Sequence, residues 1–234
     1  MSSSAHLLSG QIYLNCEPGD ALPDSTIIIS GPSRSGTSLI AAIAHAGGLW
    51  LGDQMDKVMF ADEEFVRAIN PHPQLLRRIV IGARNISEPA LALRGINPKQ
   101  LRQLIANRNA RYQRWGFKLP NIVAQLGDNE FKLFRNPRLI LIMRNPIAMA
   151  GRIAVGNRHR FTDAIDSAKR SLQANITAIR RLKIPILALS HAKATADLDA
   201  LYDTIFDFCG MTCPEIAMQT FVRSWRQLAQ SIKG

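Results

Sequence analysis

The stretch from Gly31 to Ser38 has the glycine spacing of a phosphate-binding loop. Four residues separate Gly31 from Gly36, and the hydroxyl side chains of Thr37 and Ser38 follow the second glycine. Nucleoside triphosphatases carry a lysine directly after that glycine, where its ammonium group reaches the outer phosphates. In this chain Thr37 holds that position, and the cation of the loop is Arg34. The residue types therefore predict an anion site that lacks the usual triphosphate lysine.

The residues on either side of the loop predict the elements that would hold an anion there. Residues 26–30 (TIIIS) form a short apolar run rich in β-branched residues and predict a buried strand. Residues 37–46 follow a helical pattern that ends at Gly47 and Gly48. A strand, a glycine loop and a helix in this order direct backbone N–H groups at a ligand, and the helix dipole favours negative charge there.

The other apolar patterns of the chain alternate between strand and helix. Strands are predicted at 115–119, 139–143 and 185–190. Helices are predicted at 62–69, 147–155 and 197–208, the last ending at Gly210. Two further helices are predicted with caps: one begins at Pro98 after the cap Asn97, and one runs from the cap Thr162 to Leu182. Thr212 with Glu215 predicts a capping box for the last helix. This alternation predicts an α/β fold with a mainly parallel sheet.

Composition and charge narrow the class of protein. The chain has 234 residues, of which 47% are apolar, and no apolar run reaches the roughly 18 residues of a membrane span. The N-terminal stretch lacks a signal-peptide pattern, so we expect a soluble cytoplasmic protein with reduced cysteines.

The net charge is +11, and residues 77–160 hold 17 basic and 3 acidic residues. This positive middle favours an anionic ligand or partner: a nucleotide, an acidic glycan, nucleic acid or a membrane surface.

Three segments in order resemble the PAPS-dependent sulfotransferases, which move a sulfuryl group from 3′-phosphoadenosine 5′-phosphosulfate (PAPS) to an acceptor. Residues 31–40 (GPSRSGTSLI) are similar to the loop that holds the 5′-phosphosulfate. Residues 115–120 (WGFKLP) resemble a Trp-Gly-x-Lys-x-Pro segment of bacterial members, and 139–152 (LILIMRNPIAMAGR) the strand, turn and helix at the 3′-phosphate. Residues 185–211 are a weaker fourth match.

The resemblance implies a fold and a domain organisation. The fold is a three-layer, P-loop-like α/β structure in which helices flank a mainly parallel central sheet. The chain would form a single sulfotransferase-like domain over residues 1–234, with 49–114 as a helical insertion on the acceptor side.

The resemblance also implies roles at the nucleotide. The 5′ end would contact Gly31, Ser33, Arg34, Ser35, Gly36, Thr37 and Ser38. Arg144 would bind the 3′-phosphate, and Arg152 stands where the family has a serine that bonds the same phosphate. Arg34 and Lys118 would neutralise the transferring sulfuryl group and the leaving phosphate oxygen. The chemistry implies no metal.

The catalytic base is the part of the pattern from which this chain departs. An acceptor hydroxyl must lose a proton, which a histidine or carboxylate within reach usually takes. In the stretch FADEEFVRAIN, Ala61 stands where the family has a glutamate, so Asp62, Glu63 and His72 are the candidates. At a later match, His191 stands where a Tyr-Glu pair of the family predicts glutamate.

Three functions follow as hypotheses. The first is a sulfotransferase that uses PAPS and a hydroxyl or amine acceptor, with a glycan, a lipid and a small metabolite left open as acceptors. The second is a degenerate P-loop kinase or nucleoside triphosphatase, which needs Mg²⁺ and normally the missing lysine. The third is an inactive sulfotransferase-like protein that binds anions or nucleic acid. Aromatic residues are only 6% of the chain, which does not favour base stacking, so no specific nucleic-acid partner is expected.

Overall fold

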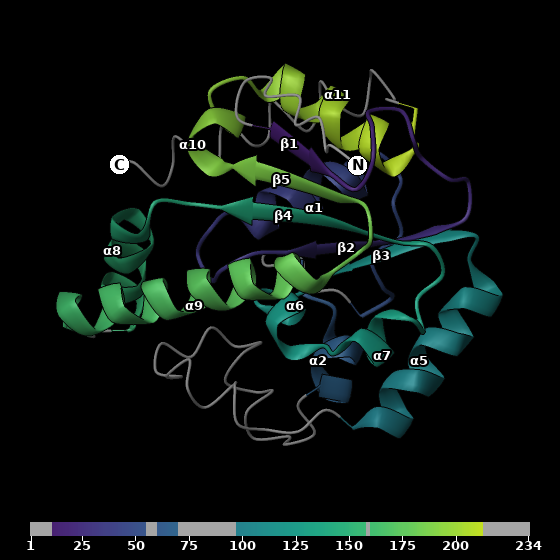
Figure 1. The fold of residues 1–234 in the computed structure, drawn as a ribbon, viewed down its shortest axis with the longest axis horizontal. Coiled ribbons are helices and arrows are strands. Elements are labelled where there is room, and N and C mark those ends of the chain that lie inside the picture. The colour runs from purple at the N-terminus through teal and green to yellow at the C-terminus, as the bar shows by residue number, and fades with distance from the viewer. Residues whose placement is uncertain (1–10, 55–59, 70–96, 158–159, 213–234) are drawn as a thin grey trace.

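A five-stranded sheet runs through the computed structural model, which describes residues 11–54, 60–69, 97–157 and 160–212 (Figure 1). The strands lie in the order β1 (Gln11–Leu14), β5 (Ile186–Ser190), β4 (Pro137–Met143), β2 (Ser25–Ser30) and β3 (Arg114–Lys118). Neighbouring strands are parallel except at the edge, where β1 is antiparallel to β5. The mainly parallel sheet of the sequence-based prediction is therefore confirmed.

Alternate residues of the strands face opposite sides of the sheet and build two apolar cores. In β2, Ile27 and Ile29 belong to one core and Ile28 to the other, and all three are fully buried. A strand that is covered on both faces reads as a continuous apolar run, because neither face meets water. This explains why TIIIS and LILIM lack the alternation of polar and apolar residues.

Helices cover both faces of the sheet and complete three layers (Figure 1). One face carries α1 (Thr37–Ala46), α10 (His191–Ala194) and α11 (Leu198–Cys209). The other face carries α2 (Glu63–Ile69), α5 (Pro98–Arg111), α6 (Ile122–Gln125), α7 (Asp128–Phe131) and α9 (Phe161–Arg181). The helix α8 (Pro146–Asn157) packs against α9 through a small apolar cluster of its own. The structure confirms the predicted α/β class.

The helix ends test the predicted caps. Asn97 accepts a hydrogen bond from the Gln100 N–H at the start of α5, as predicted. Asp197, predicted as the first residue of a helix, instead caps α11 and accepts a hydrogen bond from the Ala200 N–H. The prediction for Thr162 is wrong: α9 begins at Phe161, and Thr162 is exposed within its first turn, because the chain turns helical one residue earlier. Glu215 of the predicted capping box lies outside the described residues.

The segment 49–114 is described only in part. The structure places α2 and α5 within it, whereas 55–59 and 70–96 lie outside the described residues, so the acceptor-side insertion stays a prediction. None of the helices in the described ranges is both long enough and apolar enough to cross a membrane. Within the same ranges, no three His, Cys, Asp or Glu side chains gather where a metal ion would fit.

Candidate functional site

The loop between β2 and α1 has a backbone that depends on its glycines. Gly36 caps α1 with φ of 109°, and Gly31 has φ of 152°. A Cβ built on Gly31 would lie 2.2 Å from the carbonyl oxygen of Ile142 on the neighbouring strand. Arg34 has φ of 66°, a left-handed conformation that is uncommon outside glycine, and its side chain is exposed. The loop thus turns tightly and presents α1's first N–H groups at the carboxyl ends of the strands.

Two hydroxyl groups in and before this loop are buried without a hydrogen-bond partner. Ser30 and Ser35 are fully buried, and neither hydroxyl has a partner among the residues that the structure describes. The Oγ of Ser35 lies 2.9 Å from a Cβ built on Gly31, so it points across the loop. Buried polar groups are nearly always hydrogen-bonded. An unpaired hydroxyl inside a loop of this shape is what an anion with acceptor oxygens would satisfy.

Two arginines stand beside the loop without a counter-ion. Arg144 follows β4 directly, and Arg152 lies two turns into α8. Neither forms an ion pair within the described part of the chain. Burial lowers the pKa of Arg144, and the positive charge of Arg152 lowers it further. Arg144 is partly buried and Arg152 is exposed, and two neighbouring cations that repel each other favour an anion beside them.

His191 joins these arginines from the next strand. Met143 of β4 pairs with Ser190 of β5, so Arg144 and His191 leave the sheet side by side, at the edge to which both arrowheads point in Figure 1. A Cβ built on Gly36 would lie 2.5 Å from Cδ2 and 3.2 Å from Nε2 of His191, so this edge of the imidazole faces the loop. Burial lowers the pKa of His191 to about 4, with Arg144 and Arg152 contributing. The imidazole is therefore neutral at pH 7.

Lys118 ends β3 on the other side of the loop strand. It pairs with Ile29 of β2, and its side chain is buried, with 1% of the residue exposed. Lysine is rarely buried to this extent unless it is paired, because the ammonium group loses its hydration. The lysine of the WGFKLP segment thus lies next to the strand that leads into the loop, and its role at a sulfuryl group stays a prediction.

Asn121 connects the loop to the long helix α9, and no sequence pattern singled it out. Its N–H donates to the carbonyl of Gly31 at 2.9 Å, and its Nδ2 lies 3.5 Å from Oγ of Ser33. Its Oδ1 accepts from Oγ of Ser171 at 2.6 Å and from Nδ2 of Asn175 at 2.8 Å. Asn121 has φ of 60°, which asparagine tolerates better than most residues. The only sequence feature that could have marked Asn121 as a site residue is its position directly after Leu119 and Pro120.

Asp62 is held in an internal ion pair. It is 1% exposed and accepts from both terminal nitrogens of Arg108, at 2.5 and 3.2 Å, and from the N–H groups of Glu64 and Phe65. The Arg108 guanidinium also lies 4.9 Å from the Phe65 ring centroid. Burial raises the pKa of Asp62, and Arg108 counteracts that rise. A carboxylate with these partners is not free to take a proton from an acceptor.

The other predicted bases are less constrained or not described. Glu63 lies at the start of α2 and pairs with Arg67 at 2.9 Å on the surface. His72 lies outside the described residues. Of the remaining loop residues, Thr37 is buried, whereas Ser33 and Ser38 are partly exposed.

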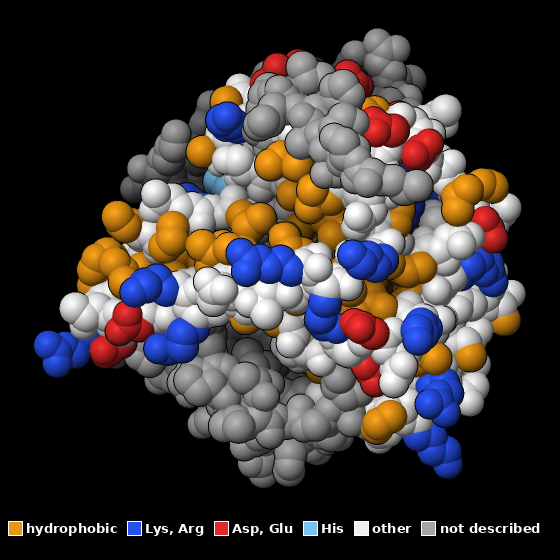
Figure 2. Space-filling model, in the orientation of Figure 1, with side chains coloured by type: hydrophobic (Ala, Val, Ile, Leu, Met, Phe, Trp, Pro, Cys, Tyr) orange, Lys and Arg blue, Asp and Glu red, His pale blue; other side chains and the backbone are white. Residues whose placement is uncertain are grey.

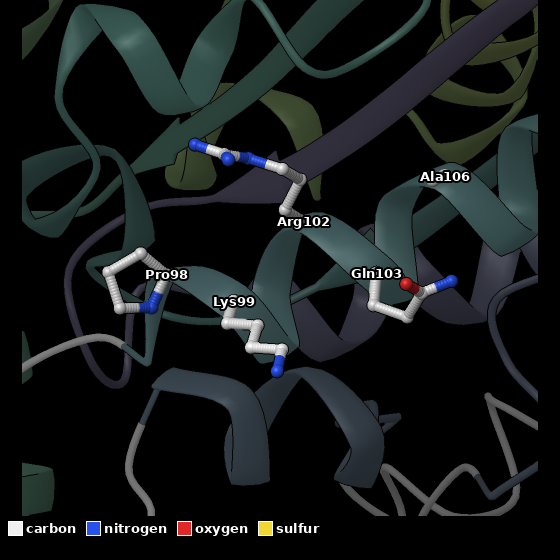
Figure 3. Close-up of a pocket in the computed structure, with 5 residues that line it drawn as sticks. All are labelled: Pro98, Lys99, Arg102, Gln103 and Ala106. Atoms are coloured by element: carbon white, nitrogen blue, oxygen red, sulfur yellow. The ribbon is translucent and has the colours of Figure 1, made fainter.

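A separate hollow of about 580 Å³ lies along the outer side of α5 and is lined by Pro98, Lys99, Arg102, Gln103 and Ala106 (Figure 3). In the close-up, the side chains of Lys99 and Arg102 extend in different directions and do not converge on one point. None of the residues predicted from the sequence lines it. The hollow therefore lacks the convergent polar groups that the loop and the two arginines provide.

Comparisons with known proteins agree with the layered architecture. No protein-family model matches the sequence, and no curated protein is similar to it. Among solved structures, the sulfotransferase STF1 from Mycobacterium tuberculosis H37Rv matches with a TM-score of 0.52 and 15% identity, over 87% of this chain and 72% of that one. The sulfotransferase domain of the Synechococcus PCC 7002 olefin synthase matches with a TM-score of 0.49 and 16% identity, over 86% and 78%.

An unliganded sugar kinase from Janibacter sp. HTCC2649 matches with a TM-score of 0.46 and 13% identity, over 81% of this chain and 96% of that one. At these identities a likeness establishes the fold and not the activity. The chain has a P-loop-type sulfotransferase fold, with the mainly parallel sheet and flanking helices described above.

Proposed function

We propose that the protein is a sulfotransferase that takes its sulfuryl group from PAPS. The observation that carries this proposal is the pair Arg144 and Arg152, two cations that form no ion pair with any residue that the structure describes, beside a phosphate loop that lacks the triphosphate lysine. A nucleotide with anionic groups on both its 3′ and 5′ positions matches two separate anion sites at one edge of the sheet. α/β sheets bind ligands at the carboxyl ends of their strands, where these residues lie.

Each residue of the site has a role in this proposal. The loop from Gly31 to Ser38, with Arg34 and the unpaired hydroxyl of Ser35, binds the 5′-phosphosulfate. Arg144 and Arg152 bind the 3′-phosphate by charge-assisted hydrogen bonds. In sulfuryl transfer the sulfur leaves the phosphate oxygen as the acceptor oxygen approaches, and negative charge grows on the leaving oxygen. Lys118 and Arg34 stabilise that charge by fixed positive charge.

The structure removes one of the three candidates for the catalytic base that the sequence predicted. Asp62 has a structural role, because Arg108 and two backbone N–H groups occupy its carboxylate. Glu63 and His72 remain candidates for taking the acceptor's proton. The acceptor group is a hydroxyl or an amine. Glycans, lipids and small metabolites are the classes of acceptor to screen. The proposed reaction takes place in the cytoplasm.

A second candidate is a protein that binds the same nucleotide and transfers nothing. The engagement of Asp62 by Arg108, together with Ala61 in place of a glutamate, favours it. The two candidates share the nucleotide site and differ only in turnover, so binding is measured first and transfer of labelled sulfate to acceptor pools second.

Calorimetric titration with adenosine 3′,5′-bisphosphate in EDTA tests the nucleotide site, beside ATP with Mg²⁺. We expect metal-independent binding of the bisphosphate that Arg144→Ala and Arg152→Ala each weaken by about ten- to a hundredfold, the range for a lost charge-assisted hydrogen bond. Arg102→Ala on α5 is the matched control, since Arg102 is an exposed arginine away from the loop. Preference for Mg-ATP, or no binding of either nucleotide, would overturn the proposal.

A further inference from the structure

The imidazole of His191 lies beside Gly36 of the phosphate loop, and Arg144 and Arg152 act on it electrostatically. Its Cδ2–Nε2 edge faces Gly36, as close as 2.5 Å to the position of a Cβ on that glycine. The side chain of Ile142 on β4 lies 3.3 Å from the same position, so loop, strand and imidazole are in close contact. His191 itself is partly buried at the end of β5. The ring therefore lies against the residue that caps α1.

The charged groups that act on the His191 imidazole lie at the end of β4 and on α8. Arg144 at the end of β4 and Arg152 on α8 are the charged residues of the described chain that act on its imidazole. The loop contributes the uncharged Gly36 beside the ring. Within the described part of the chain, the charges that act on the ring are therefore positive.

We propose that His191 is a proton-linked ligand of the phosphate held by Arg144 and Arg152, neutral in the free protein and protonated in the complex. This inference rests on the proposed nucleotide site and adds to it a third positive donor that exists only when the anion is present. No covalent bond changes: one proton passes from solvent to a ring nitrogen of His191 as the phosphate binds.

The electrostatic reason lies in the sign of the local field. In the free protein, burial and two arginines hold the His191 pKa at about 4, well below the usual value for histidine. A phosphate dianion between the arginines reverses the field at the ring, so the pKa rises and a proton is taken up. Affinity therefore increases as pH falls from the raised pKa of the complex toward 4, by up to about tenfold per pH unit.

The same reasoning gives a preference among ligands. A terminal phosphate monoester carries close to two negative charges near neutral pH, whereas a sulfate ester or phosphodiester carries one. The larger charge shifts the His191 equilibrium more strongly. The site thus favours a nucleotide with a free 3′-phosphate monoester over one with a phosphodiester at the 3′ position by more than the two arginines alone would provide.

The test measures proton uptake directly. Adenosine 3′,5′-bisphosphate is titrated into the wild-type protein and His191→Gln at pH 6.5, each in two buffers of different ionisation enthalpy. Because the ligand's own titration is common to both proteins, the difference in proton uptake belongs to His191. We expect the wild type to take up a larger fraction of a proton, and its affinity advantage over His191→Gln to grow as pH falls from 8 to 6.

His45→Gln is the matched control, since His45 is an exposed histidine in the last turn of α1, and it should behave as the wild type. Should His191→Gln not fold, NMR of the wild-type imidazole replaces it: the His191 signal must move toward the protonated form when the bisphosphate is added. Binding with equal proton uptake in both proteins, or an imidazole signal that stays neutral, overturns this inference alone. Absence of bisphosphate binding overturns it together with the proposed function.

Discussion

At the scale of single residues, Gly36 meets two requirements that no other residue type satisfies together. Its φ of 109° lies in the region that glycine adopts without strain, and any Cβ there would collide with the imidazole of His191. Asn121 and Arg34 also have positive φ, so the loop and its support contain several unusual backbone conformations. Such conformations persist where surrounding contacts enforce them, and they are concentrated at binding sites.

The substitution Gly36→Ala tests whether the positive φ and the contact with His191 both require glycine at this position. We expect a loss of stability of at least about 1–2 kcal/mol from the left-handed backbone alone, with a further loss from the contact with His191. Urea unfolding measures it. The double variant Gly36→Ala with His191→Ala should recover the part that is due to the contact, while the backbone part remains. Equal stability of the two variants would show that the collision with His191 carries no cost.

At the scale of elements, an ion pair joins α2 to α5. Asp62 caps the start of α2 and pairs with Arg108 of α5, and the two side chains are 0% and 4% exposed. Glu64 adds a second carboxylate to the same guanidinium at 2.5 Å. Because the partners are 46 residues apart, the pair closes a long segment of chain. It holds α2 against the sheet on the side of the proposed acceptor region.

Arg108→Leu should destabilise the protein by about 3–5 kcal/mol at pH 7, since it leaves a buried carboxylate unpaired. Burial already raises the pKa of Asp62, and loss of Arg108 would raise it further. A raised pKa in the folded state means that stability is retained at low pH, where the carboxyl is protonated, and lost as pH rises through the folded pKa. The defect should therefore be smaller at pH 4.5 than at pH 7, as urea unfolding at both values would reveal; an equal defect would contradict the assignment.

At the scale of the whole molecule, the chain carries a net charge of +11. Figure 2 shows Lys and Arg side chains spread along α9 and over neighbouring surfaces of the same face, with acidic side chains among them. Positive charge of this kind raises the arrival rate of anionic ligands. The specific recognition that we propose depends instead on the few cations at the edge of the sheet.

Binding of the nucleotide should stabilise the entire fold, because the site joins the ends of β2, β4 and β5 with α1 and α8. At a bisphosphate concentration of about one hundred times Kd, linkage adds about 2.7 kcal/mol. For a chain of this size that corresponds to a rise in Tm of about 5–10 °C. Thermal unfolding with and without the ligand, in EDTA, measures the rise. Adenosine at the same concentration should produce none, and an equal rise with adenosine would contradict a phosphate-based site.

Much of the fold was determined by the sequence itself, because its signals are local. The run TIIIS, the glycines of the loop and the cap Asn97 act through neighbouring residues, and the structure has α1 at 37–46 as predicted. The edge strand β1 escaped prediction, because a short strand at the edge depends on its pairing with β5, far along the chain.

The site divides in the same way between sequence and tertiary structure. The loop and Arg144 follow from motifs, and their roles at a nucleotide stay predictions to be tested. Only the tertiary structure decided that Arg108 occupies Asp62, that Asn121 joins the loop to α9, and that His191 faces Gly36. These contacts join residues that are 46, 54 and 155 positions apart. Such pairings arise from the order of strands in the sheet, which no local pattern encodes.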